Sequence, residues 1–347
     1  MQNLKWGIIG AGAIAKSLCQ YISDNNQSTI IKIYSRNYDN AKKLANSFGC
    51  LPTCDYNDII NDIDINAVII ALPDHLHFEV AMKALNSYKN VFIEKPFVRN
   101  SDECDILFNI AIQNNLLLFE GMAYKYHPRT KILNSYIQEN KSSSPTYINN
   151  QVGFRIGRIR DKLLPLSLLL KKYSSDRLLV DDYGALYDLG CYPVSMTNMI
   201  VKHMNSGVLV SPIGYEIKSV KNHKDINLSA EIILHYDKNI KATIKYSIIE
   251  GLNGKLALHD DDFIINYSRP YTCESKSELN FLSIDLDINY RLKSYMSPMS
   301  CEIDHFIQLL HDNKTESPLN TYLEISNNIK TLNCIESELS KHKERKH

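Results

Sequence analysis

Residues 6–15, Trp-Gly-Ile-Ile-Gly-Ala-Gly-Ala-Ile-Ala, decide the fold of this chain. The apolar run from Trp6 to Ile9 predicts a buried parallel strand, and the segment from Ala13 to Tyr21 predicts the helix that follows it. The turn between them has the spacing G-x-G-x-x-A, which brings the backbone close to a pyrophosphate at the helix N-terminus. The stretch therefore predicts a dinucleotide site at Gly10, Gly12, Ala13 and Ile14.

The composition is that of a globular protein with room for two domains. The 347 residues are 44% hydrophobic and 22% charged, and 39 basic residues balance 39 acidic ones. This balance argues against a nucleic-acid or membrane partner, and no apolar run approaches the roughly 20 residues of a membrane helix. The eight cysteines are scattered without metal-ligand spacing, so we expect idle thiols, no metal site and a reduced, cytoplasmic protein.

Strands and helices alternate through the first third of the chain. Apolar runs predict strands at Ile30–Ser35, Ala67–Leu72, Val91–Glu94 and Leu116–Phe119, with helices between them, one of them Tyr38–Phe48 before Gly49. This rhythm predicts a doubly wound parallel sheet, in which ligands bind outside the carboxyl ends of the strands. The residues expected there are Ser35, Arg36, Leu72, Pro73, His77, Glu94 and Lys95.

The end of the second strand chooses between the two nicotinamide cofactors. An NAD site usually has an acidic residue here for the ribose 2′-hydroxyl, whereas this chain has Ser35, Arg36 and Asn37. A hydroxyl and a guanidinium suit a 2′-phosphate, so the sequence favours NADP over NAD. The alternative interpretation is a solvated loop arginine.

Glu94-Lys95-Pro96 is the most informative of the strand ends. A lysine at this position directs its ammonium toward the cofactor crevice, where it can hold a substrate hydroxyl or carbonyl oxygen. Pro96 removes a backbone donor and stiffens the turn, which is also compatible with a cis peptide bond.

The pattern changes at about Pro145. Apolar and polar residues alternate over Leu228–Leu234, Ile240–Ile248 and Leu282–Ile288, which predicts antiparallel strands with one covered face. We therefore expect a dinucleotide-binding domain at 1–123 and an α+β domain with an open, mainly antiparallel sheet at 124–347. The exposed sheet face predicts a homodimer or homotetramer.

Taken together, these motifs resemble the sugar and cyclitol oxidoreductases typified by glucose–fructose oxidoreductase and inositol dehydrogenase. The matching pieces are residues 7–15, Ser35-Arg36, Pro73 to His77, Glu94-Lys95-Pro96, residues 120–128 and Gly184-Ala-Leu-Tyr-Asp-Leu-Gly-Cys-Tyr192-Pro193. The resemblance implies a Rossmann domain and a substrate-binding α+β domain. It also implies catalytic roles for Lys95, Asp188 and Tyr192, in the tyrosine branch that includes dimeric dihydrodiol dehydrogenase and nucleotide-sugar ketoreductases.

Further positions extend or limit this resemblance. Tyr124, His127 and Arg155 are second-rank candidates for substrate contact. Asp188 and Tyr192 stand four residues apart, which places them on one face of an expected helix. Relatives commonly carry a glycine run where this chain has Tyr183 before Gly184, and segment 158–183 fits no family pattern, so the substrate stays open.

The implied reaction is hydride transfer between nicotinamide and a carbinol or keto carbon of a sugar, nucleotide-sugar or cyclic polyol. Either Tyr192 carries the hydroxyl proton, with Lys95 lowering its pKa, or Lys95 carries it and Tyr192 positions the substrate. Two alternatives are a glycosidase of the same fold that retains its nicotinamide cofactor, and a non-catalytic NADP-sensing regulator. A sensor would have no use for Lys95, Asp188 and Tyr192 together, which favours the oxidoreductase.

Overall fold

The computed structural model describes residues 3–140, 146–153, 158–159, 162–163, 184–223, 226–272, 277–283 and 296–344. Arg155, Tyr183, most of segment 158–183 and residues 284–288 of the last expected strand lie outside the described residues. The chain folds as two compact units, Met1–His127 with Met296–Ser326, and Pro128–Tyr295 with Asn327–His347. The first unit thus takes in a C-terminal segment that the expected division at 123/124 assigns to the second domain.

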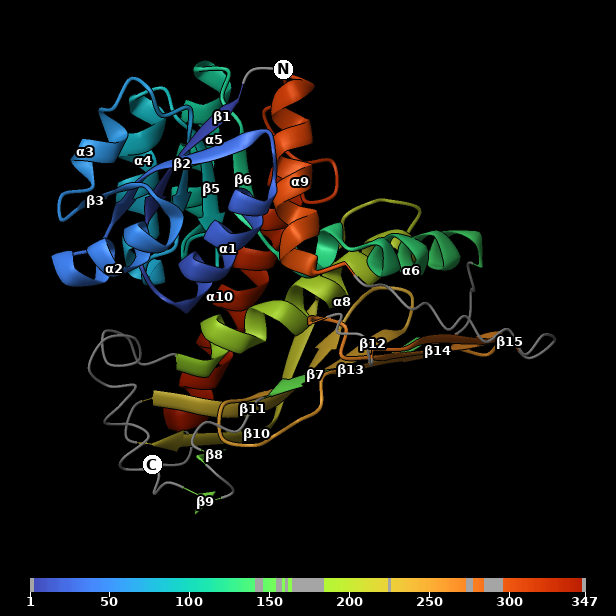
Figure 1. The fold of residues 1–347 in the computed structure, drawn as a ribbon. Helices are drawn as coiled ribbons and strands as arrows, with labels where there is room; N and C mark the ends of the chain where they lie inside the picture. The colour runs from blue at the N-terminus through green and yellow to red at the C-terminus, as the bar shows by residue number, and fades with distance from the viewer. Residues whose placement is uncertain are drawn as a thin grey trace. The chain divides into compact units, whose positions relative to one another are not determined.

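A six-stranded parallel sheet forms the first unit, in the order β3-β2-β1-β4-β5-β6 (Figure 1). Its strands are β1 Leu4–Ile9, β2 Ser28–Tyr34, β3 Leu51–Thr53, β4 Ala67–Ile70, β5 Asn90–Glu94 and β6 Leu118–Gly121. Its helices are α1 Ala13–Asp24, α2 Tyr38–Phe48, α3 Asn57–Ile60, α4 His77–Asn86, α5 Ser101–Gln113 and α9 Pro298–His311, with short turns η1 Asp74–Leu76 and η2 Ala123–Tyr126. This strand order is that of the Rossmann fold, which confirms the expected doubly wound sheet.

Local sequence explains the boundaries of these elements. β4 is buried at every position, as expected for a strand covered on both faces. The Asn37 side chain accepts from the first N–H groups of α2, and Gly49 ends that helix in the left-handed conformation with φ of 66°. The expected helix Tyr38–Phe48 is therefore observed with the same bounds.

The C-terminal helix α9 completes the core of the first unit. The ring of Phe306 lies 5.0 Å from Trp6, 5.9 Å from Phe92 and 5.4 Å from Phe119, measured between ring centroids. All four rings are fully buried. Burying these apolar faces is what holds a segment from the end of the sequence on a sheet made by its beginning.

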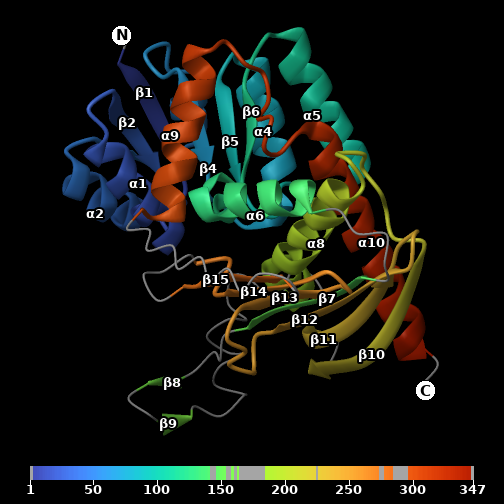
Figure 2. The ribbon, with the colours of Figure 1, turned by 90° about the vertical axis from the view of Figure 1, so that its right-hand side faces the viewer.

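The second unit is built on a seven-stranded sheet in the order β10-β11-β12-β7-β13-β14-β15 (Figure 2). Its strands are β7 Thr146–Gly153, β10 Gly214–His223, β11 Ile226–His235, β12 Ile240–Ser247, β13 Lys255–His259, β14 Phe263–Ser268 and β15 Leu279–Ser283, with a separate ribbon of β8 Arg158–Ile159 and β9 Lys162–Leu163. All neighbours in the large sheet pair antiparallel except β12 and β7. The expected mainly antiparallel sheet is confirmed.

Helices cover one face of this sheet. They are α6 Pro128–Glu139, α8 Cys191–Met204 and the later part of α10, which spans Tyr322–Glu344. Tyr136 of α6 stacks on Phe281 at 4.0 Å and meets Phe263 edge-on at 5.7 Å. Burial alternates along β14, so one set of its side chains faces the helices and the other set faces away.

The described ranges contain neither a membrane-spanning helix nor a cluster of metal-binding side chains. No helix there is long and apolar enough to cross a membrane. Within the same ranges, no three or more His, Cys, Asp or Glu side chains are grouped to hold a metal ion.

Candidate active site

The turn after β1 has the geometry that a dinucleotide requires. Gly10 has φ of +133°, and a Cβ there would lie 2.3 Å from the carbonyl oxygen of Ala71 at the end of β4. Only glycine fits both the conformation and the space. α1 begins at Ala13, and Gly12 at its N-cap makes no side-chain cap. The first turn of α1, with the exposed Ala13 and half-buried Ile14, therefore presents backbone N–H groups and the positive end of the helix dipole.

The end of β2 presents a basic and a hydroxyl side chain. Ser35 donates its backbone N–H to the carbonyl of Thr53 at 3.1 Å, and its hydroxyl accepts from the N–H of Asn37 at 3.3 Å. Arg36 between them is exposed. These contacts hold the loop backbone and leave a guanidinium at its surface, a donor set that fits a 2′-phosphate.

Residues 94–97 after β5, called the Lys95 turn below, contain a cis peptide bond between Lys95 and Pro96. Lys95 is half-buried, and its backbone N–H donates to Glu94 Oε2 at 3.3 Å. Because β1, β4 and β5 are neighbours in the sheet, the Gly10 turn, Leu72 and the Lys95 turn all lie at one carboxyl edge. The structure thus brings the expected cofactor-side residues of the first unit to one edge.

His77 holds the Lys95 turn from the side of β4. Its Nε2 lies 3.0 Å from the carbonyl oxygen of Leu72, and its Nδ1 lies 3.0 Å from Pro96 O and 3.2 Å from Phe97 O. Burial lowers the pKa of His77, against the opposing effect of these carbonyl groups. The side chain is only 1% exposed and lies between the loop after β4 and the Lys95 turn.

Glu120, at the end of β6, supports the same turn. Asn320 donates to Glu120 Oε2 at 2.8 Å, and Lys125 Nζ donates to Asn320 Oδ1 at 2.7 Å. Burial raises the pKa of Glu120, and Asn320, Lys125 and the backbone of Phe97 act against that rise. Sequence reasoning missed Asn320, because it lies 200 residues from Glu120.

Two second-rank substrate candidates lie inside the protein. Tyr124 and His127 are each 0% exposed, so their observed surroundings are those of packed side chains. Lys95 belongs to the first unit, whereas Asp188 and Tyr192 belong to the second.

Asp188 lies in a π-helical turn, Leu186–Gly190, that leads directly into α8. The expected helix is present, but this wide turn changes the α-helical spacing between Asp188 and Tyr192. A Cβ on Gly190 would lie 3.0 Å from the ring of Tyr246 on β12, so the turn packs closely on the sheet. Single π-helical turns occur often at functional sites, which agrees with the position of Asp188.

Tyr192 is the second residue of α8, in its first turn, and is half-buried. Its ring centroid lies 5.2 Å from that of Tyr271. The hydroxyl of Tyr271 makes a short hydrogen bond with Asn150 Oδ1 on β7, and the amide of Asn150 donates to the carbonyl of Pro193 at 3.3 Å. The ring of Tyr271, against which Tyr192 packs, is therefore fixed by a hydrogen bond to the sheet.

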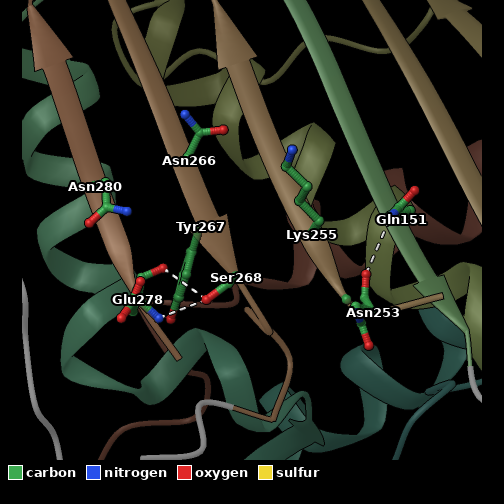
Figure 3. Close-up of a pocket in the computed structure, with 9 residues that line it drawn as sticks. Gln151, Asn253, Lys255, Asn266, Tyr267, Ser268, Glu278 and Asn280 are labelled. Carbon is green, nitrogen blue, oxygen red and sulfur yellow. Dashed lines mark hydrogen bonds between the residues drawn. The ribbon is translucent and has the colours of Figure 1, made fainter. Parts of the chain in front are cut away.

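The face of this sheet opposite Asn150 carries a hollow of about 300 Å³ (Figure 3). Gln151 lines it and follows Asn150 on β7, so the two side chains point to opposite faces. Side chains of neighbouring strands complete the lining, among them Lys255, Asn266 and Asn280. The hollow and Tyr192 therefore lie on opposite sides of the sheet.

Comparison with known proteins identifies the first unit. Residues 4–122 match the family model GFO_IDH_MocA, described as an oxidoreductase family with an NAD-binding Rossmann fold. The trans-1,2-dihydrobenzene-1,2-diol dehydrogenase of Xenopus tropicalis is 22% identical over 91% of this chain and 92% of its own length. The dTDP-3,4-didehydro-2,6-dideoxy-alpha-D-glucose 3-reductase of Actinomadura kijaniata is 27% identical over 57% of this chain, and this match spans only 56% of the reductase.

A solved structure extends the likeness to both units. The fold of KijD10, a 3-ketoreductase from Actinomadura kijaniata in complex with NADP and TDP-benzene, superposes with a TM-score of 0.79 at 18% identity, covering 96% of each chain. At this identity the superposition establishes the fold. The first unit is thus similar to the NAD-binding domain of this oxidoreductase family, and the fold of both units is similar to that of KijD10.

Proposed function

We propose that this protein is an NADP-dependent oxidoreductase that transfers hydride between nicotinamide and a carbinol or keto carbon of a sugar, nucleotide-sugar or cyclic polyol. The observation that carries the proposal is the Lys95 turn, a lysine at the same carboxyl edge of a Rossmann sheet as the Gly10 turn. The relatives named above act on diol or sugar carbons, and KijD10 was crystallised with NADP, which supports this substrate class and cofactor.

The cofactor, when bound, supplies or accepts the hydride. Gly10 and the first turn of α1 fit its pyrophosphate, and Ser35 and Arg36 fit its 2′-phosphate. Pro73 and Leu72 line the switch point from the side of β4.

The protein's own residues handle the proton. We assign Tyr192 as the group that takes the hydroxyl proton during oxidation and returns it during reduction. Tyrosine has a reference pKa of about 10, so the ammonium of Lys95 is assigned to lower it and to polarise the same oxygen. Asp188 is assigned to orient the sugar through a second hydroxyl. In the alternative assignment, Lys95 carries the proton and Tyr192 positions the substrate.

The first test is a titration of the purified protein with NADPH and with NADH, followed by the fluorescence of Trp6, the single tryptophan. Tight NADPH binding and weak NADH binding are expected. Nucleotide-sugars, free sugars, cyclic polyols and diols are then screened for turnover by NADPH absorbance. Binding of neither cofactor would contradict the proposal, and cleavage of a glycoside without net NADPH change would assign the retaining-glycosidase class instead.

The second test removes the two assigned groups. Tyr192→Phe and Lys95→Ala should each lower kcat by about a hundredfold while cofactor binding stays near wild type. Tyr88→Phe and Lys42→Ala are the matched controls, since both side chains are exposed. Wild-type turnover in either test variant would reject that residue's role.

A further inference from the structure

Glu302 on α9 is a buried carboxyl for which the proposed reaction has assigned no role. It is 1% exposed, and among the described residues its Oε2 has no hydrogen-bond partner. An ionised carboxylate in such surroundings is costly unless it is paired and hydrogen-bonded. A buried glutamate that lacks these partners needs a separate explanation.

The packing of α9 brings Glu302 to the Lys95 turn. Phe306 lies one helical turn after Glu302, and its ring packs 5.9 Å from that of Phe92 on β5. Glu94 lies two residues after Phe92 and points to the same face, because a Cβ on Gly121 would meet both the Phe92 ring and Glu94 Oε1.

The distance along α9 from Phe306 back to Glu302 is similar to the distance along β5 from Phe92 forward to Glu94. Four residues advance a helix by about 6 Å, and two residues advance a strand by about 6.6 Å. α9 runs opposite to the strands of the sheet (Figure 1), so where Phe306 meets Phe92, Glu302 one turn earlier lies toward the end of β5 that carries Glu94. The electrostatics agree, since burial and then the charge of Glu94 hold the pKa of Glu302 well above its ordinary value.

The other groups around Glu302 do not stabilise a second charge. The titratable groups of the elements packed at this part of α9 include Glu94 and Lys95 at the end of β5, Glu120 from β6, Tyr126 and Lys125 from η2, Cys19 from α1, and Cys301, Asp304 and His305 on α9 itself. Burial lowers the pKa of His305 and raises that of Cys19 to about 12, so both are neutral at neutral pH. Lys125 donates to Asn320, and its charge acts on Glu120.

We propose that Glu302 stays protonated at neutral pH and donates a hydrogen bond to the carboxylate of Glu94, forming a proton-sharing pair that positions the Lys95 turn. Two adjacent carboxyl groups hold one proton more firmly than either would alone. The pair links α9 to Glu94, and Glu94 in turn accepts the backbone N–H of Lys95. Glu302 is thus a positioning residue for Lys95, and this role rests on the function proposed for that lysine.

The protonation is tested by infrared spectroscopy of the whole protein, which needs no substrate. At neutral pH, subtracting the spectrum of Glu302→Gln from that of wild type should show the carbonyl stretch of one protonated carboxyl. Asp304→Asn on the exposed side of the same helix should leave this band in place. A difference spectrum between wild type and Glu302→Gln that lacks the band overturns the pair even if the protein proves to be an active NADP enzyme.

The positioning role is tested by kinetics once a substrate is known. Gln can donate to Glu94 as the protonated acid does, whereas Leu cannot, so Glu302→Gln should keep kcat about tenfold or more above that of Glu302→Leu at similar KM. Equal kcat in the two variants would refute the positioning role. Should Glu302→Leu fail to fold, the infrared band still decides the protonation. Absence of NADPH binding in wild type would instead reject the proposed function.

Discussion

Nδ1 of His77 lies 3.0 Å from the carbonyl oxygen of Pro96, so an imidazole on α4 lies directly against the Lys95 turn. The other ring nitrogen lies 3.0 Å from Leu72 O, so the single N–H of the neutral ring donates either to the end of β4 or to the Lys95 turn. His77→Ala should lower the free energy of unfolding by about 3 kcal/mol, because it leaves a buried carbonyl group without a donor. Urea unfolding followed by Trp6 fluorescence measures the loss. His75→Ala, exposed two residues earlier, is the control and should behave as wild type.

The same residue predicts a pH dependence. Burial lowers the pKa of His77 below its ordinary value of 6.5, so the unfolded chain binds this proton first as the pH falls. The contribution of neutral His77 to stability is therefore complete above pH 6.5 and is lost as the pH drops below it. The stability difference between wild type and His77→Ala should shrink in unfolding experiments carried out at decreasing pH. A difference that grows toward acid would contradict the assigned direction.

Gly10→Ala should abolish dinucleotide binding. The added Cβ would lie 2.3 Å from Ala71 O in a backbone conformation that alanine rarely adopts, so the turn must move. Gly49→Ala is the matched control: its φ is also positive, but no atom lies within 4 Å of the added Cβ. It should cost about 1 kcal/mol of stability and leave NADPH titrations unchanged. Equal NADPH affinity in the two variants would disprove the role of the Gly10 turn.

Arg36→Ala tests the cofactor preference. A guanidinium that binds the 2′-phosphate contributes only to NADPH, so Kd for NADPH should rise about tenfold or more while Kd for NADH stays constant. Fluorescence titration of both cofactors gives the two values, with Lys42→Ala as the surface-charge control. An equal change in the affinities for NADPH and NADH would show that Arg36 does not bind the 2′-phosphate.

Tyr271 should support catalysis without touching the cofactor. Its ring packs against Tyr192, and its hydroxyl is bonded to Asn150. Tyr271→Leu removes both the ring and the hydroxyl and should lower kcat by about tenfold, whereas Tyr271→Phe retains the ring and should lose less. Steady-state kinetics with NADPH in excess separates kcat from KM. If the Phe variant falls as far as the Leu variant, the hydroxyl rather than the ring supports Tyr192.

We expect Glu302 to change the free energy of unfolding with pH in the direction opposite to that of His77. Its folded-state pKa is raised above the ordinary 4.5, so on raising the pH the unfolded chain loses the proton first and wild type loses stability. Glu302→Gln has no such proton to lose. Its stability relative to wild type should therefore increase as the pH rises from about 4 through neutrality, by about 1.4 kcal/mol for each unit of pKa difference. A constant difference across this range would contradict a raised pKa.

Local patterns were sufficient for much of the first unit. The apolar strands, the helix that ends at Gly49 and the glycine turn at Gly10 depend on neighbours within a few residues, so each was predictable from the sequence. Lys95 was selected as a candidate because it directly follows the carboxyl end of a predicted parallel strand. The cis peptide before Pro96 was named only as compatible with the turn, and the structure contains it.

Predictions that depended on spacing over longer distances were less complete. The rule that places Asp188 and Tyr192 on one helix face assumes α-helical spacing, whereas the turn Leu186–Gly190 is π-helical and packs closely on Tyr246 of β12. The sequence predicted His77 at the cofactor edge but not its contacts with the carbonyl groups of Leu72, Pro96 and Phe97. Neither feature follows from hydrophobic periodicity, because that pattern carries no information about the tertiary contacts of a turn.

The sequence by itself determined the alternation of strands and helices, the glycine turn after β1, and the positions of Arg36 and Lys95 at strand ends. Each follows from backbone sterics and local burial, which act over a few residues. The tertiary structure alone brought Asn320 to Glu120 and Tyr271 against Tyr192, and it brought Glu302 close enough for the charge of Glu94 to raise its pKa. Residues so far apart in sequence meet only when buried apolar faces pack, as α9 does through Phe306, because that packing supplies the energy that holds them together.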